Sequence, residues 1–346
     1  MSRKVGPSSD SYIIVDKEKY PGEDILNTET LRTFYKIPDV EVLQLKQGKM
    51  WCRVYGKDAS NKVPILLCIG GTGTSMFYKN FAIKMQTLCN GPVIIFDRFN
   101  MGLSDQVFSE RNSFELWGSQ IKQMLDILGY KKVNFMGFSL GCFIATHFLQ
   151  SNRQYCERLA LISGQLGGFD TTSGGYKTLM LAKKINYFCC LRDTVGALVA
   201  PYLVKKKLYG DRAKDQVREG GDPDGLSVCL AMYRVKGFAY HIYQQMCDGA
   251  IVRYNKNGNS AVLKKLNAFS IPTYARNYEQ DDEVDLKKFE KEWKILTNGD
   301  IGKLCKYEIM PGEHHKFYVD DCADTVCEFF SNGGGGGGTV DSKSSE

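Results

Sequence analysis

The chain has 346 residues, of which 43% are hydrophobic and 24% are charged, and its formal net charge is +6. These values are typical of a globular protein and exclude a largely disordered chain, and no heptad or triplet repeat indicates a coiled coil or a collagen. The longest basic run is only Lys205-Lys206-Lys207, so the positive charge does not indicate a nucleic-acid partner. A chain of this length can bury a core without help from a metal or a disulfide.

The cysteines and the N-terminal residues predict a cytoplasmic location. The twelve cysteines include no C-x-x-C pair, and the first residues contain no apolar signal segment. Several cysteines lie within apolar stretches, for example Cys68 and Cys142, where a thiol behaves as a small hydrophobic side chain. We therefore expect a reducing compartment, and no metal or other cofactor is predicted.

The first half of the chain predicts a hairpin followed by a parallel sheet. Residues 1–38 are weakly patterned and are interpreted as an N-terminal extension. Two alternating runs within residues 40–55 flank a glycine-containing turn, which is typical of a β-hairpin. Short apolar runs, each suited to a strand buried on both faces, then follow at residues 64–69, 93–96, 133–136 and 159–163. Helical patterns separate them, most clearly at residues 114–128.

The alternation of strands and helices stops at residue 164 and returns after residue 265. Residues 164–265 contain no clear strand and carry 16 basic against 8 acidic residues, so we interpret them as an inserted helical cap. Strands are then expected at residues 271–275 and 307–310, and helices at residues 286–296 and 323–330. The sequence thus predicts an α/β fold with a doubly wound, mostly parallel sheet. Its segments are 1–38 (extension), 39–163 (first core part), 164–265 (cap), 266–330 (second core part) and 331–346 (glycine-rich tail).

A G-x-S-x-G motif lies where the third predicted buried strand meets an apolar helix. Its residues are Gly137-Phe138-Ser139-Leu140-Gly141. A nucleophile on so tight a turn adopts a strained backbone conformation, and the neighbouring chain comes close enough that only glycine fits on either side. Ser139 is therefore the candidate nucleophile, with Gly137 and Gly141 forming its elbow.

With this motif, the chain resembles the α/β-hydrolase superfamily over about residues 40–164 and 266–330. Residues 69–73 (IGGTG) resemble the family's H-G-G-P-G oxyanion loop, with isoleucine in place of histidine. Residues 97–105 (DRFNMGLSD) resemble D-R-P-G-x-G-x-S-D, with Asn100 where glycine is usual. Asparagine tolerates a left-handed backbone, so this second departure is mild.

The resemblance implies a Ser-His-Asp triad whose acid and base follow the nucleophile in the chain. The family pattern, in which an Asp follows I-P-T in the loop after the strand, places the acid at Asp281, with Asp282 as its rival. The pattern P-G-x-x-H places the base at His315, with His314 as the alternative. The backbone N–H groups of Leu140 and Gly71 would form the oxyanion hole.

The resemblance further implies a serine hydrolase that cleaves carboxylic esters through an acyl-enzyme, with lipid esters or thioesters as possible substrates. In the family, a cap in this position covers the site. The basic residues of the cap predicted here suggest peripheral contact with an anionic membrane surface. The alternative is a binding or scaffold protein that keeps the fold without turnover. The other two histidines, His147 and His241, are interpreted as a helix-face residue and a cap residue. The oligomeric state is left open.

Overall fold

The structure is a computed structural model that describes the core of the chain. The described residues are 41–59, 62–71, 74–164, 166, 232, 241, 244–245, 263–266, 271–281, 284–297, 305–311 and 322–331. The predicted extension, almost all of the predicted cap and all but the first residue of the predicted tail lie outside them. Those segment assignments therefore remain predictions.

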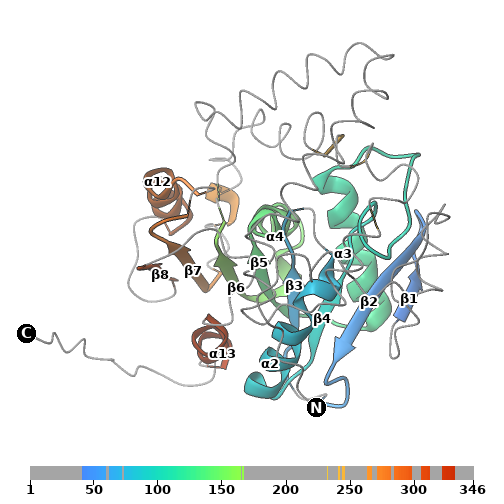
Figure 1. Ribbon diagram of the computed structural model, residues 1–346, viewed down its shortest axis with the longest axis horizontal. Coiled ribbons are helices and arrows are strands. Elements are labelled where there is room, and N and C mark those ends of the chain that lie inside the picture. The colour runs from blue at the N-terminus through green and yellow to red at the C-terminus, as the bar shows by residue number, and fades with distance from the viewer. Residues whose placement is uncertain are drawn as a thin grey trace, which may run out of the picture.

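Eight strands form one sheet in the order β1-β2-β4-β3-β5-β6-β7-β8 (Figure 1). β1 and β2 form the predicted hairpin, β2 also pairs antiparallel with β4, and the remaining neighbours run parallel. The strands are β1 (Glu41–Gln44), β2 (Lys49–Tyr55), β3 (Ile65–Cys68), β4 (Val93–Phe96), β5 (Val133–Phe138), β6 (Cys156–Ile162), β7 (Thr273–Tyr278) and β8 (Cys305–Met310). The predicted α/β fold with a mostly parallel sheet is confirmed.

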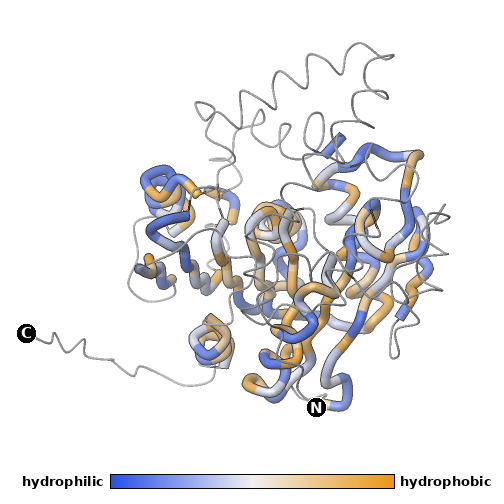
Figure 2. The backbone as a smooth tube through the Cα atoms, viewed as in Figure 1, coloured by the Kyte–Doolittle hydropathy of each residue, from blue (hydrophilic) through white to orange (hydrophobic). Residues whose placement is uncertain are grey.

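Helices cover both faces of this sheet (Figure 1). The helices of the described core are η1 (Ser75–Tyr78), α2 (Lys79–Cys89), α3 (Phe114–Leu128), α4 (Leu140–Leu149), η2 (Arg153–Tyr155), α12 (Leu286–Thr297) and α13 (Ala323–Ser331). Apolar side chains of α3, α4 and α12 belong to one core cluster, and those of α2 and α13 belong to a second. Figure 2 shows hydrophobic residues concentrated along the central strands between these two layers.

Local sequence signals explain where the elements begin and end. Ser113 caps α3 by accepting a hydrogen bond from the backbone N–H of Leu116, and Gly129 ends the helix in a left-handed conformation with φ of 78°. Every residue of β3, β4 and β5 is buried, as expected for central strands covered on both faces. The predicted strand at 271–275 begins later, at Thr273, because Pro272 has no backbone N–H to donate to a neighbouring strand. The Pro272 carbonyl still accepts a hydrogen bond from the backbone N–H of Leu159.

Cysteines take two different roles in this core. Burial raises the pKa of Cys52, Cys142 and Cys156 to about 12, so these thiols stay protonated and pack as the predicted hydrophobic side chains. Cys89 and Cys327, by contrast, form a disulfide between α2 and α13. The sequence did not predict this bond, because cysteines 238 residues apart carry no local sign of proximity.

Candidate active site

Ser139 occupies a strained turn between β5 and α4. Its backbone has φ of 50° and ψ of −120°, a conformation that side-chain-bearing residues rarely adopt. The backbone N–H of Ser139 donates to the carbonyl of Ile162 at 3.0 Å, and its own carbonyl accepts from the N–H of Cys142 at 2.9 Å. The turn is therefore held from the neighbouring strand β6 and from the first turn of the helix.

Both flanking glycines are required by close backbone approach. A Cβ atom at Gly141 would lie 1.8 Å from the carbonyl oxygen of Cys68, at the end of β3. A Cβ atom at Gly137 would lie 2.8 Å from the backbone of Cys142. The geometry expected of the G-x-S-x-G motif is thus present around Ser139.

The glycine loop after β3 lies directly against this turn. A Cβ atom at Gly70 would lie 2.7 Å from Cβ of Ser139 and 3.0 Å from the backbone nitrogen of Leu140. The next residue, Gly71, has φ of 53°, which again favours glycine. The structure therefore brings together three sequence-predicted site residues, Ser139, Leu140 and Gly71, although the next loop residues, 72 and 73, lie outside the described part.

Asp97 joins the loops that surround this glycine loop. Its buried carboxylate accepts hydrogen bonds from the Thr74 hydroxyl at 2.9 Å, from the amide and hydroxyl of Ser75 at 2.7 and 2.8 Å, and from the Leu103 amide at 2.8 Å. Burial raises the pKa of Asp97, and these donors oppose that shift. Gly102 leaves the space for this carboxylate, because a Cβ atom there would lie 2.0 Å from Asp97 Oδ2.

Arg98 reaches the glycine loop itself. Its guanidinium Nη2 donates to the carbonyl of Gly71 at 2.7 Å and the group lies over the ring of Trp117, 4.5 Å from the ring centroid. The side chain is almost fully buried. Nearby, Asn100 has φ of 69°, which confirms that asparagine replaces glycine here in a left-handed conformation.

Asp281 follows β7 at the same edge of the sheet as Ser139. Its backbone N–H donates to the carbonyl of Tyr278 at 3.2 Å, and its carboxylate Oδ1 accepts from the Val284 amide at 3.1 Å. The side chain is 6% exposed. Because β5 and β7 flank β6, the two loops are separated by two strand spacings, roughly 10 Å.

The proposed base cannot be placed. His315, its alternative His314 and the rival acid Asp282 lie outside the described residues. The described chain stops at Pro311, directly after the carboxyl end of β8, and β8 lies beside β7. The order of strands is thus compatible with a base on the loop that follows β8.

The other two histidines, His147 and His241, each pack against an aromatic ring. His147 lies on α4 as predicted, stacked on Phe114 with ring centroids 5.3 Å apart, and burial lowers its pKa. His241 is 1% exposed and packs on Phe108 at 4.6 Å, and burial lowers its pKa to about 4. Asn112 donates from Nδ2 to the carbonyl of His241 at 3.3 Å, so this residue of the predicted cap contacts the loop before α3.

The sequence reasoning missed two residues near Ser139. Ser163, which ends β6, also has a positive φ of 47° and is buried, and the motif analysis offered no signal for it. Arg98 was quoted as part of a motif, yet its bond to Gly71 was not predicted. The available signal was that Arg98, a positively charged residue, follows the buried strand β4 after only one intervening residue, Asp97.

The described residues contain neither a cluster of metal ligands nor a helix that could span a membrane. No group of three or more His, Cys, Asp or Glu side chains able to hold a metal occurs there. Nor is any helix of the described core long and apolar enough to cross a bilayer.

Comparison with known proteins agrees with this architecture. The family model of the alpha/beta hydrolase fold matches residues 63–182. Among curated proteins, 2-hydroxy-6-oxononadienedioate/2-hydroxy-6-oxononatrienedioate hydrolase 2 of Pseudomonas putida is 23% identical over 128 residues, which are 36% of this chain and 45% of that protein. The chain thus spans about half the length of the curated relatives it matches.

Two solved structures extend the likeness to most of the chain. MGS-M2, an alpha/beta hydrolase enzyme from a Medee basin deep-sea metagenome library, is 16% identical with a TM-score of 0.59, over 87% of this chain and 99% of that one. The meta-cleavage product hydrolase CumD from Pseudomonas fluorescens is also 16% identical with a TM-score of 0.59, over 84% of this chain and 97% of that one. The chain has the alpha/beta hydrolase fold.

Proposed function

We propose that the protein is a serine hydrolase that cleaves carboxylic esters through an acyl-enzyme formed on Ser139. The observation that carries this proposal is the strained backbone of Ser139 between β5 and α4, with the Gly70–Gly71 loop directly beside it. Strain of this kind persists only where the surroundings impose it, and it is concentrated at functional sites.

The reaction begins when His315 accepts the Ser139 hydroxyl proton as Oγ attacks the ester carbonyl carbon. Asp281 holds the imidazole in the required tautomer and stabilises its protonated form. The amides of Leu140 and Gly71 donate to the oxyanion that forms on the former carbonyl oxygen. Collapse of this intermediate breaks the bond to the alcohol, which leaves with the proton from His315.

Water completes the cycle. His315 removes a proton from the water as its oxygen attacks the acyl carbon, and the carboxylic acid is released when Ser139 regains its proton. No metal takes part in this scheme. The proposal carries two further parts from the sequence: the substrate is a lipid ester or a thioester, and the basic cap contacts anionic membrane surfaces.

A fluorophosphonate probe tests the nucleophile, because it reacts only with an activated serine. We expect the wild-type protein to be labelled and Ser139→Ala to remain unlabelled. Ser163→Ala is the matched control, since Ser163 is a second serine with a positive φ and lies buried at the adjacent strand end, and it should keep the label. A folded wild-type protein without labelling would favour the non-catalytic scaffold.

A second candidate reaction is hydrolysis of a carbon–carbon bond beside a ketone. It is favoured by the curated relative from Pseudomonas putida, whose name describes a 2-hydroxy-6-oxo-dienedioate hydrolase. Parallel assays separate the two: p-nitrophenyl esters of increasing chain length, and a 2-hydroxy-6-oxo dienoic acid followed by its loss of absorbance. The ester proposal predicts turnover of the esters at least tenfold above that of the dienoic acid in kcat/KM, and the reverse order supports the second candidate.

A further inference from the structure

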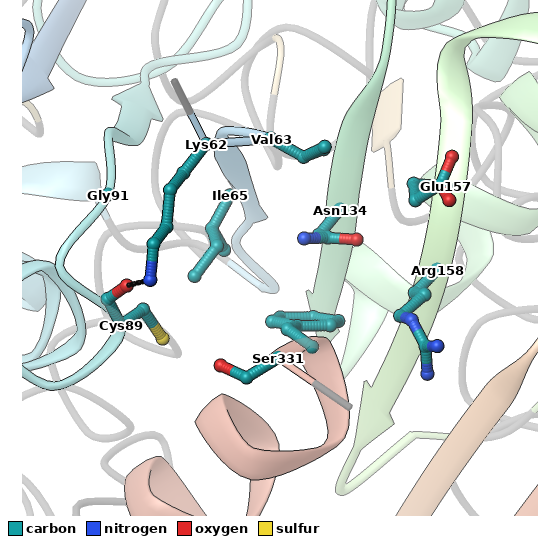
Figure 3. A pocket seen from close by; sticks show the side chains of 10 residues that line it. Lys62, Val63, Ile65, Cys89, Gly91, Asn134, Glu157, Arg158 and Ser331 are labelled. Atoms are coloured by element: carbon teal, nitrogen blue, oxygen red, sulfur yellow. Dashed lines mark hydrogen bonds between the residues drawn. The ribbon is translucent and has the colours of Figure 1, made fainter. Parts of the chain in front are cut away.

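A pocket of about 300 Å³ lies at the opposite end of the sheet from Ser139 (Figure 3). It lies at the amino ends of β3, β5 and β6, between the last residues of α2 and α13. Asn134 in the pocket and Ser139 lie near opposite ends of β5, roughly 16 Å apart at 3.3 Å per residue. The pocket is therefore separate from the candidate active site, and its volume is within the range of small-molecule sites.

Two cationic side chains line this pocket. Nζ of Lys62 donates to the carbonyl of Cys89 at 3.2 Å, which uses one of its three N–H groups. Nη1 of Arg158 donates to the carbonyl of Phe329 at 2.9 Å, and the guanidinium has further N–H groups. Both side chains are thus held in place while retaining donors for an anion.

Glu157 is the acidic residue of the lining, and its negative charge is balanced by a residue outside the pocket. The Glu157 carboxylate forms an ion pair with Nζ of Lys132 at 2.8 Å, and Lys132 does not line the pocket. The charges of Lys62 and Arg158 consequently remain in excess at this site, which favours a negatively charged ligand.

Asn134 supplies an independent indication of a ligand. The residue is 4% exposed, and its side-chain Oδ1 has no hydrogen-bond partner within the described part of the chain. Figure 3 shows its amide in the middle of the pocket, between Lys62 on one side and Arg158 on the other. A buried amide oxygen without a partner is unfavourable, and because it is an acceptor, it would be satisfied by an O–H or N–H donor of a bound molecule.

The rest of the lining is apolar and anchored. Ile65 and Phe330 lie on the same lining as the polar groups. The Cys89–Cys327 disulfide ties the end of α2 to α13, the helix that also carries Phe330. One wall is therefore covalently fixed, so the pocket needs little rearrangement to receive a ligand.

We propose that this pocket binds a small hydroxy acid, which combines a carboxylate, a hydroxyl group and an apolar body. The carboxylate lies between Lys62 and Arg158, the hydroxyl group donates to Oδ1 of Asn134, and the apolar body contacts Ile65 and Phe330. This proposal does not depend on the hydrolase activity, because none of these residues belongs to the candidate active site.

Calorimetric titration of mandelate, a hydroxy acid with an aromatic body, into the full-length protein tests the site. We expect saturable binding, and at least tenfold weaker binding to each of Lys62→Met, Arg158→Met and Asn134→Leu. Lys294→Met, which removes an exposed charge on α12 outside the pocket, should bind within twofold of wild type. The charge-reversed probe 2-phenylethylamine should not bind.

Three outcomes would overturn the proposal. They are absence of saturable mandelate binding, binding that all three pocket variants leave unchanged, and equal binding of the amine. Thermal unfolding establishes that each variant is folded, and Arg158→Lys, which keeps the charge, replaces Arg158→Met if the latter does not fold. Retained binding by Arg158→Lys with loss in Asn134→Leu would support the assignment equally well.

Discussion

At the scale of single residues, two glycines of the core, Gly141 and Gly118, differ in the space available for a side chain. Gly141 lies where the chain of β3 comes closest, with its hypothetical Cβ 1.8 Å from the Cys68 carbonyl oxygen. Gly118, in the middle of α3, has only an ordinary contact, 3.8 Å from the Phe148 ring. The same substitution therefore has opposite consequences at the two positions.

We predict that Gly141→Ala lowers ester turnover at least 100-fold and destabilises the fold by about 2 kcal/mol or more, because the backbone of the elbow must move. Gly118→Ala should instead stabilise by about 0.5–1 kcal/mol, since alanine restricts the unfolded chain and favours the helix. Urea unfolding together with an ester assay measures both. Equal stability of the two variants would contradict the close approach at Gly141.

His241 makes stability depend on pH. Its pKa is lowered from 6.5 to about 4 by burial, so the unfolded chain binds the proton more readily than the folded protein does. Its contribution to stability is complete above pH 6.5 and is lost as the pH falls toward 4. Between pH 7 and pH 5 we expect a loss of about 2 kcal/mol from this residue.

His241→Phe isolates that contribution, because phenylalanine keeps the ring that packs on Phe108 and cannot be protonated. Urea unfolding at pH 7 and pH 5 should show a smaller loss in the variant than in wild type. An identical loss in both proteins would mean that other groups account for the pH dependence.

At the scale of elements, the loops after β3 and β4 act together. Asp97 holds the start of η1 and the loop at Leu103, while Arg98 holds the Gly71 carbonyl. The position of the Gly71 amide, a proposed oxyanion donor, therefore depends on a side chain from the neighbouring strand.

Arg98→Met should lower kcat about 10- to 100-fold with little change in KM, because an oxyanion donor acts mainly in the transition state and losing one costs up to about 3–4 kcal/mol. Arg53→Met is the control, since Arg53 lies on β2 over the ring of Tyr55. Steady-state kinetics with a p-nitrophenyl ester measures both. An effect confined to KM would remove Arg98 from this role.

The elements themselves were largely predictable, because their signals are local. Residues 93–96 and 114–128 were assigned with the bounds of β4 and α3, since apolar periodicity and the cap residues Ser113 and Gly129 act within the segment. Ser139 could be predicted for the same reason, as strand, turn and helix are contiguous. The Arg98–Gly71 bond and Ser163 could not, because both depend on which strands become neighbours.

At the scale of the whole molecule, the Cys89–Cys327 disulfide joins helices from the two ends of the described core. Disulfides persist mainly in oxidising compartments, so this bond is in tension with the predicted cytoplasmic location, which remains a prediction. The bond also spans the segment between β6 and β7 that was interpreted as the cap.

We expect Cys327→Ala to destabilise the protein by about 2–4 kcal/mol, because the closed loop is long and the unfolded chain regains its freedom. Cys322→Ala is the control, since Cys322 is a buried cysteine five residues earlier that does not take part in the disulfide. Reductant should lower the stability of wild type and leave Cys327→Ala unchanged. If reductant has no effect on wild type, the bond does not form in solution.

The same bond closes residues 90–326 into a covalent ring. A protease that nicks the backbone anywhere within this ring leaves two fragments that stay attached through sulfur. Such nicked protein would migrate as one band on a denaturing gel run without thiol and as two bands after reduction. Partial digestion can therefore report the disulfide and the accessible segments of the ring in a single experiment.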